Sequence, residues 1–206
     1  MVGEARADVL VEKGSTAHVT DHGDVAVERG SGAIQVRCPE GVSVLIGSDS
    51  GRVRIRGRVG SCRVTTRSGS IEVERAADVD ARTDSGSITV ADSAGSCRCH
   101  TGSGNLKVER SPDADLVSGS GNVTARVATR ARVRAGSGNV TLDLDDVGDV
   151  DIEVHSGNAR VAVPHDSRPA LDLEVGSGTV RSSVASGVDG RVRVRAGSGT
   201  ITVEAR

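Results

Sequence analysis

The chain contains no phenylalanine, tyrosine or tryptophan among its 206 residues. Sugar-binding faces and single-strand nucleic-acid platforms usually stack aromatic rings on their ligands, so this composition argues against both kinds of site. The 26 basic and 28 acidic residues give a formal net charge of −2. Such a balance provides no overall field that would attract nucleic acid or an anionic membrane. We therefore expect no nucleic-acid partner.

The sequence also has no apolar run long enough to span a membrane. Its first residues, Met-Val-Gly-Glu-Ala-Arg, lack the apolar core of a secretory signal. We expect a cytoplasmic location for the sequence as given. A location at the cell surface or in the envelope is the expectation if these residues are a piece of a longer protein.

Ser-Gly pairs, by contrast, are abundant and regular. Ten of them recur with their glycines 17 to 21 residues apart. A fixed period near twenty residues is typical of a repeat protein, in which each unit buries its apolar side against its neighbours. The glycines of the ten pairs are Gly32, Gly51, Gly69, Gly86, Gly104, Gly121, Gly138, Gly157, Gly178 and Gly199.

Apolar residues occupy fixed positions around every one of these glycines. They stand seven and five residues before the glycine and two and four residues after it, as Ala131, Val133, Val140 and Leu142 do around Gly138. Only Ser182 breaks the pattern over the whole chain. Spacing by two is the period of a β-strand, so each unit holds one strand entering the Ser-Gly corner and one leaving it. Glycine suits the corner because it adopts positive φ without strain.

Charged residues six positions before the glycines indicate how the units stack. Six of the seven neighbouring pairs in this series are of opposite sign. Parallel coils would place these side chains about 4.8 Å apart, where opposite charges attract. Each exposed pair is worth roughly 0–1 kcal/mol, so the series selects a register more than it adds stability. It favours stacked parallel coils over antiparallel hairpins, and its members are Arg63, Asp80, Arg98, Asp115, Arg132, Asp151, Asp172 and Arg193.

The repeats divide the chain simply. Residues 24–206 are predicted to form a single β-solenoid domain, and residues 1–23 a leading segment in which Val9 and Val11 start a partial first coil. The longest connections are 145–149, 164–170 and 185–191. All fall at the same point of the coil, so we expect them along one edge of the solenoid. Such an edge is either a contact surface or a place that tolerates length change.

No catalytic, cofactor-binding or metal-binding residues are assigned. Cys62, Cys97 and Cys99 fall at inward positions and are expected to be small apolar fillers without disulfides, which favours a reducing compartment. His100 should point outward, away from these thiols. Cys38, six residues after its glycine, is likewise expected to be a small apolar filler. The other histidines show no zinc-type spacing; they are His18, His22, His155 and His165.

Three groups of polar residues are candidates for surface roles. Four asparagines just after successive corners are expected to form a hydrogen-bond ladder; they are Asn105, Asn122, Asn139 and Asn158. A basic group, whose default role is a solvated strand face, comprises Arg52, Arg54, Arg56 and Arg58. An acidic group expected on adjacent coils is either plain surface or a site for a cation or basic partner; it comprises Asp151, Glu153, Asp172 and Glu174.

Repeated Gly-Ser-Gly-Asn-Val-Thr units at 119–124 and 136–141, with variants at four later or earlier corners, resemble the adhesin family of bacterial β-strand-repeat proteins. The resemblance covers nearly the whole chain. It implies a right-handed β-solenoid. Together with the spacing of the glycines, this gives the predicted fold, which is all-β, a right-handed parallel β-helix of about ten coils with 17–21 residues per coil. The resemblance also implies a non-enzymatic surface or scaffold role with a protein or cell-envelope partner.

Two functional hypotheses follow. The first is an interaction module that binds a macromolecule through its loop edge or self-associates through its ends. The coil containing Val192, Val194, Ile201 and Val203 comes last in the sequence and would present an uncovered end, so we expect end-to-end self-association or a cap from outside these residues. The alternative is a polysaccharide-active β-helix enzyme, which would need clustered carboxylates in a groove.

Overall fold

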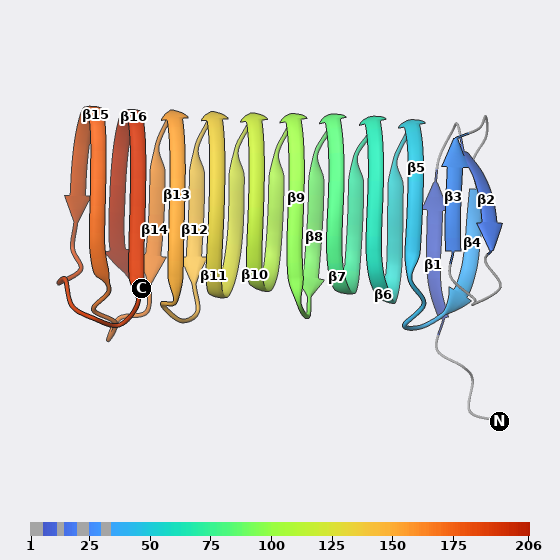
Figure 1. The fold of residues 1–206 in the computed structure, drawn as a ribbon, viewed down its shortest axis with the longest axis horizontal. Helices are drawn as coiled ribbons and strands as arrows, with labels where there is room; N and C mark the ends of the chain where they lie inside the picture. Colours follow the sequence, from blue (N-terminus) through green and yellow to red (C-terminus); the bar gives the residue numbers. More distant parts are fainter. Residues whose placement is uncertain (1–5, 12–14, 20–24, 30–33) are drawn as a thin grey trace.

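The computed structural model describes residues 6–11, 15–19, 25–29 and 34–206, with side chains from residue 40 onward. About 77% of the chain is strand, and the described residues contain no helix. The strands stack as a parallel β-solenoid of about nine turns (Figure 1). The predicted fold is therefore confirmed. The first predicted corner, at Gly32, lies outside the described residues.

Sixteen strands make up the described solenoid: β1 (Arg6–Val11), β2 (Ser15–Val19), β3 (Val25–Arg29), β4 (Ile34–Pro39), β5 (Val44–Ser50), β6 (Val53–Ser68), β7 (Ile71–Ser85), β8 (Ile88–Ser93), β9 (Ser96–Ser103), β10 (Leu106–Ser120), β11 (Val123–Ser137), β12 (Val140–Leu144), β13 (Asp149–Ser156), β14 (Ala159–Val163), β15 (Ala170–Ser182) and β16 (Arg191–Ala205). The long strands among them run through a bend of the coil and contribute to both sides of the solenoid. We call the side formed by residues that precede the Ser-Gly corners the entering face. The side formed by residues that follow the corners is the leaving face.

Every pairing between strands from β5 onward is parallel and joins equivalent positions of two coils. On the entering face Asp115 lies opposite Arg132, and Arg132 lies opposite Asp151. The charge series therefore predicted the register of these strands correctly.

The Ser-Gly corners need glycine for two reasons. Gly138 has φ of 130°, in a region that side chains rarely adopt. A Cβ atom built on Gly138 would also lie 2.2 Å from the carbonyl oxygen of Gly121 in the preceding coil. At Gly69 the close approach alone requires glycine, because a Cβ atom there would lie 1.9 Å from the carbonyl oxygen of Gly51. The glycine column thus permits the coils to stack at strand spacing.

The core is the thin space between the two faces, and the predicted inward columns fill it. Val133, Val140 and Leu142 are buried, as are their equivalents in the other central coils. Near the corners, buried hydroxyl groups of Thr83 and Thr101 donate hydrogen bonds to glycine carbonyls of the preceding coil, at 3.2 and 2.9 Å. These bonds satisfy polar groups that would otherwise be costly to bury.

The last two coils do not follow the order of the sequence. β16 pairs with β13 and β14 on one side and with β15 on the other. Figure 1 shows β16 between β14 and β15, with β15 at the far end of the solenoid. The expectation that the coil containing Val192 and Ile201 is uncovered is wrong, because both residues are fully buried. The end coil is instead 170–182.

Strand order also departs from the sequence at the other end. β1 lies antiparallel between β4 and β6, and β2 is antiparallel to β3. Val9 and Val11, expected to start a partial coil, pair with residues of both β4 and β6. The predicted domain boundary at residue 23 stays a prediction.

Candidate functional site

The entering face carries rows of charge that change sign from coil to coil. β11 presents Arg130, Arg132 and Arg134 outward, and the next coil presents Asp149, Asp151 and Glu153 at the paired positions. The next row lies on β16 and contains Arg191, Arg193 and Arg195. The last row lies on β15 and contains Asp172 and Glu174.

The insertion of β16 removes the one exception in the charge series. In sequence order Asp172 would lie beside Asp151. In the structure Arg193 lies between them and pairs with both positions, and its Nε donates a hydrogen bond of 2.9 Å to Asp172 Oδ2. This bond raises the pKa of Arg193. Like charges directly opposite one another are destabilising, which gives a physical reason for the observed order.

The prediction that Asp151, Glu153, Asp172 and Glu174 form one acidic patch on adjacent coils is therefore wrong. Glu153 and Glu174 are also separated, by Arg195, whose Nε lies 3.4 Å from Glu174 Oε2. Glu153 has a second basic neighbour, Arg134, at 3.6 Å. An arrangement that alternates acids with arginines does not provide the concentrated negative charge that a cation site needs.

A shallow groove of about 630 Å³ runs along this face near the corners. Its floor is a row of glycines from successive coils, and its walls include His100, Val117, Glu153 and Glu174. A polysaccharide-active β-helix would need clustered carboxylates in a groove. Glu153 and Glu174 are half-exposed or more, and each lies beside an arginine. The enzyme alternative stays a prediction.

The end coil leaves backbone and apolar surface without a partner. In the part of the chain that the structure describes, β15 pairs only with β16. Its inward side chains are incompletely covered: Leu171, Leu173 and Val175 are half-buried, and Val180 is 40% exposed. Ser182, the single polar residue at an inward position, is exposed in this coil. The break in the sequence pattern thus marks the end of the stack.

The three long connections lie together on one edge of the solenoid, as predicted, and this edge adjoins the end coil (Figure 1). The amide of Arg191 donates to the carbonyl of Gly148 at 2.8 Å, and that of Ala170 to the carbonyl of Gly190 at 2.9 Å. Asp189 Oδ2 accepts a bond from the Arg168 amide at 2.9 Å. These contacts join 145–149, 164–170 and 185–191 into a loop edge at the lower left of Figure 1. Its most exposed apolar residue is Val188, at 92%.

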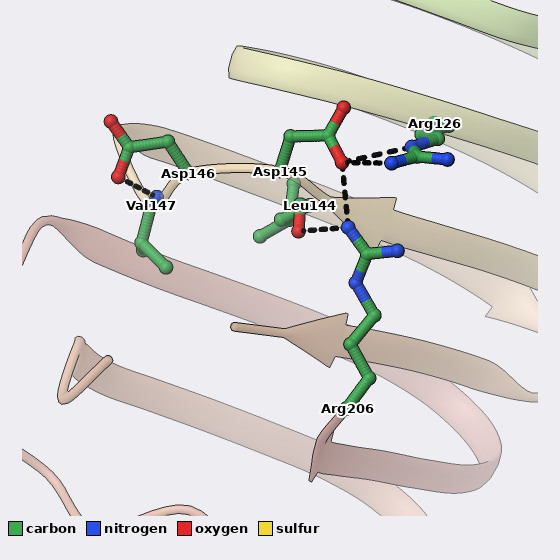
Figure 2. A network of polar contacts seen from close by, with 6 residues as sticks. All are labelled: Arg126, Leu144, Asp145, Asp146, Val147 and Arg206. Carbon is green, nitrogen blue, oxygen red and sulfur yellow. Dashed lines mark hydrogen bonds and ion pairs between the residues drawn. The ribbon is translucent and has the colours of Figure 1, made fainter. Parts of the chain in front are cut away.

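A polar network fixes the C-terminal residue to a coil two positions away. Asp145 Oδ1 accepts bonds from Arg126 Nε at 2.8 Å and from Arg206 Nη2 at 2.6 Å (Figure 2). Arg206 also donates to the Leu144 carbonyl at 2.9 Å. The hydrogen bond from Arg126, followed by that from Arg206, holds the pKa of Asp145 below its ordinary value. The network links the end of β16 to the segment that follows β12.

The three cysteines whose side chains the structure describes lie where the sequence predicted. Cys62, Cys97 and Cys99 are buried free thiols, and His100 is exposed on the opposite side of β9. Burial raises the pKa of Cys62 to about 12. A hydrogen bond with Cys97, whose sulfur lies 3.6 Å away, and burial raise the pKa of Cys99. Such thiols are protonated and poorly reactive. The described residues contain no His, Cys, Asp and Glu group that could hold a metal ion.

The asparagine ladder is confirmed. The side-chain oxygen of Asn105 accepts from the Asn122 amide at 2.9 Å, and Asn122 and Asn139 continue the chain of bonds to the next coils. Asn158 then bonds the Thr200 amide at 3.0 Å, because β16 occupies the next place. These residues join the corners of successive coils together.

Among the residues whose side chains the structure describes, the basic group and the histidines His155 and His165 form no cluster with a ligand-binding arrangement. Arg54 Nε lies 2.7 Å from Glu72 Oε2, and Arg52 Nε lies 3.7 Å from Glu72 Oε1. His155 and His165 are exposed on different parts of the chain. The side chains of His18, His22 and Cys38 lie outside the part of the chain that the structure describes.

Comparison with known proteins agrees with the fold. A family model for Toastrack DUF4097, a domain of unknown function, matches residues 12–205. No curated protein and no solved structure matches the chain. No helix that could cross a membrane is found among the described residues. The adhesin role implied by the resemblance stays a prediction. Because the match covers nearly all of its length, the chain belongs to the Toastrack DUF4097 family.

Proposed function

We propose that the chain is a non-enzymatic scaffold module that binds a protein partner through the open end formed by β15 and the adjoining loop edge. The observation that carries the proposal is one edge of β15, a strand of 13 residues, with which no described strand pairs. Proteins normally protect a strand of this length at a sheet edge. Val180 and Val188 add exposed apolar surface at the same end. An adhesin-like use of this end would make the partner a cell-envelope protein.

Site-specific photo-crosslinking in cells tests the proposal. A photoreactive residue at Val180 lies on the open end, whereas one at Thr141 lies on the leaving face of a central coil. We expect discrete crosslinked products from position 180 that disappear when Leu173→Lys places a charge on the end surface. Equal crosslinking from both positions, or products insensitive to Leu173→Lys, would contradict the proposal.

Self-association through the ends is a second candidate, supported by the same open strand. Light scattering over a concentration series measures it directly. A mass that rises with concentration, and that returns to one chain in Val180→Lys, supports this candidate. The matched control is Thr179→Lys, which changes the neighbouring exposed residue in the same strand. A constant single-chain mass at high concentration counts against self-association.

A further inference from the structure

The end coil repeats the surface on which the chain places its own strand β16. On one side of β16, the arginines pair with Asp149, Asp151 and Glu153. On the other side, Arg193 and Arg195 pair with Asp172 and Glu174 of β15. The free side of β15 presents the same two carboxylates to whatever lies beyond it. The end is therefore built like the surface that already holds a strand of alternating arginine and valine.

We propose that the partner contributes a β-strand in which basic residues alternate with small aliphatic residues, added in parallel to the free edge of β15. This inference rests on the proposed function. The basic side chains of the added strand would face Asp172 and Glu174. Its aliphatic side chains would extend the inward rows of Leu171, Leu173 and Val175, which are half-buried. Strand addition supplies backbone hydrogen bonds, and alternate side chains supply specificity.

The backbone of β15 is oriented for such an addition. The amide of Ala170 donates to Gly190 in the segment leading to β16, at 2.9 Å. Alternate residues of a strand in a parallel sheet direct their backbone groups to opposite sides. The amide and carbonyl groups of Leu171, Leu173 and Val175 are therefore directed away from β16. No described strand pairs with this side of β15.

Charge also argues against a second copy of this strand as the occupant. Two antiparallel copies of 170–177 centred on Leu173 would place Asp172 of each copy opposite Glu174 of the other. Like charges at directly opposed positions are destabilising. A strand with the pattern of β16 instead continues the alternation of acidic and basic rows. The charge of the end therefore favours a basic strand from a different protein.

A synthetic peptide with the sequence of residues 190–198, Gly-Arg-Val-Arg-Val-Arg-Ala-Gly-Ser, is the probe. Its matched control carries glutamate at the three arginine positions. We expect the arginine peptide to bind the full chain, measured by fluorescence anisotropy, and the glutamate peptide to show no binding at a hundredfold higher concentration. Raising the salt concentration should weaken binding because the pairs are exposed. Equal binding of the two peptides would overturn the proposal.

Protein variants locate the site. Asp172→Asn combined with Glu174→Gln should weaken binding of the arginine peptide about tenfold, as expected for two lost charge pairs. Asp84→Asn combined with Glu109→Gln removes the same charge from exposed positions in other coils and should leave binding unchanged. Circular dichroism confirms that both variants fold. Equal weakening in the two variants would mean that only net charge is recognised, which refutes a site on β15.

Hydrogen exchange separates addition from strand exchange. Bound peptide should protect the amides of Leu171, Leu173 and Val175 while those of 192–196 stay protected. Loss of protection in 192–196 would show that the peptide replaces β16, contrary to the proposal. If crosslinks from position 180 persist while the two peptides bind alike, only the identity of the partner strand is wrong. If crosslinks at that position are absent as well, the proposed function itself fails.

Discussion

The central coils, residues 53–144, and the C-terminal coils, residues 149–206, are built from the same repeat but stacked by different rules. In the central region each coil lies on the one that precedes it in the sequence. In the C-terminal region, 170–182 does not pair with the preceding coil. Residues 191–205 lie between the two and pair with both. The inward columns are apolar in both regions, with the single exception of Ser182. The regions differ in the signs of their outward charges: chain order would place Asp172 beside Asp151, two residues of like charge. In the structure the order of the coils departs from chain order there, and each charged row lies beside a row of opposite sign.

The largest difference between the two regions should appear on burying a charge. Val140 and Val180 occupy the same column, but Val140 is 1% exposed and Val180 is 40% exposed. Val140→Asp should cost several kcal/mol of unfolding free energy, because an ion would be stranded among aliphatic side chains. Val180→Asp should cost much less, and so should Thr141→Asp on the outward side. Urea denaturation measures all three, and similar losses at 140 and 141 would contradict the inward and outward assignment.

Reversing an arginine within the rows sharpens the comparison. Arg132 lies between Asp115 and Asp151, and Arg193 lies between Asp151 and Asp172. Replacing either with glutamate converts two attractive pairs into two repulsive ones, at a cost on the order of 1–3 kcal/mol. Arg193→Glu should also expose the amides of β15 to hydrogen exchange, because β16 is the only described partner of that strand.

Arg132→Glu should leave the protection of β11 largely intact, because that strand has neighbours on both sides. The cost of both changes should fall in 1 M salt. If Arg193→Glu left exchange in 170–182 unaltered, charge pairing would not be what holds the end coil.

The same residues show how much of this arrangement the sequence could reveal. The period of the Ser-Gly pairs predicts the corners, the inward columns and the parallel stack, because each depends on local geometry repeated ten times. The order of the last two coils depends on which surfaces meet, and a period carries no such information. Two exceptions did signal it: Asp151 beside Asp172 in the charge series, and Ser182 among the apolar columns.

The candidate site could be predicted only in part for the same reason. The loop edge follows from where the long connections fall in each coil, and the structure confirms it. The sequence order of the coils predicts the wrong coil for the open end, because β16 stacks between β14 and β15. The long connection 164–170 lets the chain leave one coil position empty after β14. The connection 185–191 then brings the chain back, so that β16 fills this position. Together with the two exceptions, these connections would have identified 170–182 as the end.

A smaller, pH-dependent effect is expected from the Asp145 network at the end of β16. Arg126 and Arg206 lower the pKa of Asp145 below 3.8, so the folded state favours the carboxylate. The resulting stability is fully present above that ordinary value and is lost as the pH falls through the lower folded value. Asp145→Asn should therefore cost at most about 1 kcal/mol near pH 7, since the group is partly exposed. The difference from the native chain should vanish at the lowest pH.

Asp146→Asn is the matched control for Asp145→Asn. The Asp146 side chain accepts a hydrogen bond of 2.8 Å from the Val147 amide, and asparagine retains an oxygen in that position. Its stability should therefore follow that of the native chain at every pH. A constant offset between Asp145→Asn and the native chain down to low pH would show that ionisation of Asp145 is not the source of the effect.

The smallest effect on stability should come from Ser182→Val, which restores the apolar pattern at the one place where it is broken. The matched change in a central coil is Leu142→Ser, at the same position of the repeat, where the side chain is fully buried. Leu142→Ser should cost a few kcal/mol, because it removes apolar contacts and buries a hydroxyl group. Ser182→Val should change the unfolding free energy by less than about 0.5 kcal/mol, since residue 182 is exposed. If a partner covers position 182 in solution, valine should strengthen that association. Light scattering would then detect a larger mass, even though urea denaturation shows little change in unfolding free energy.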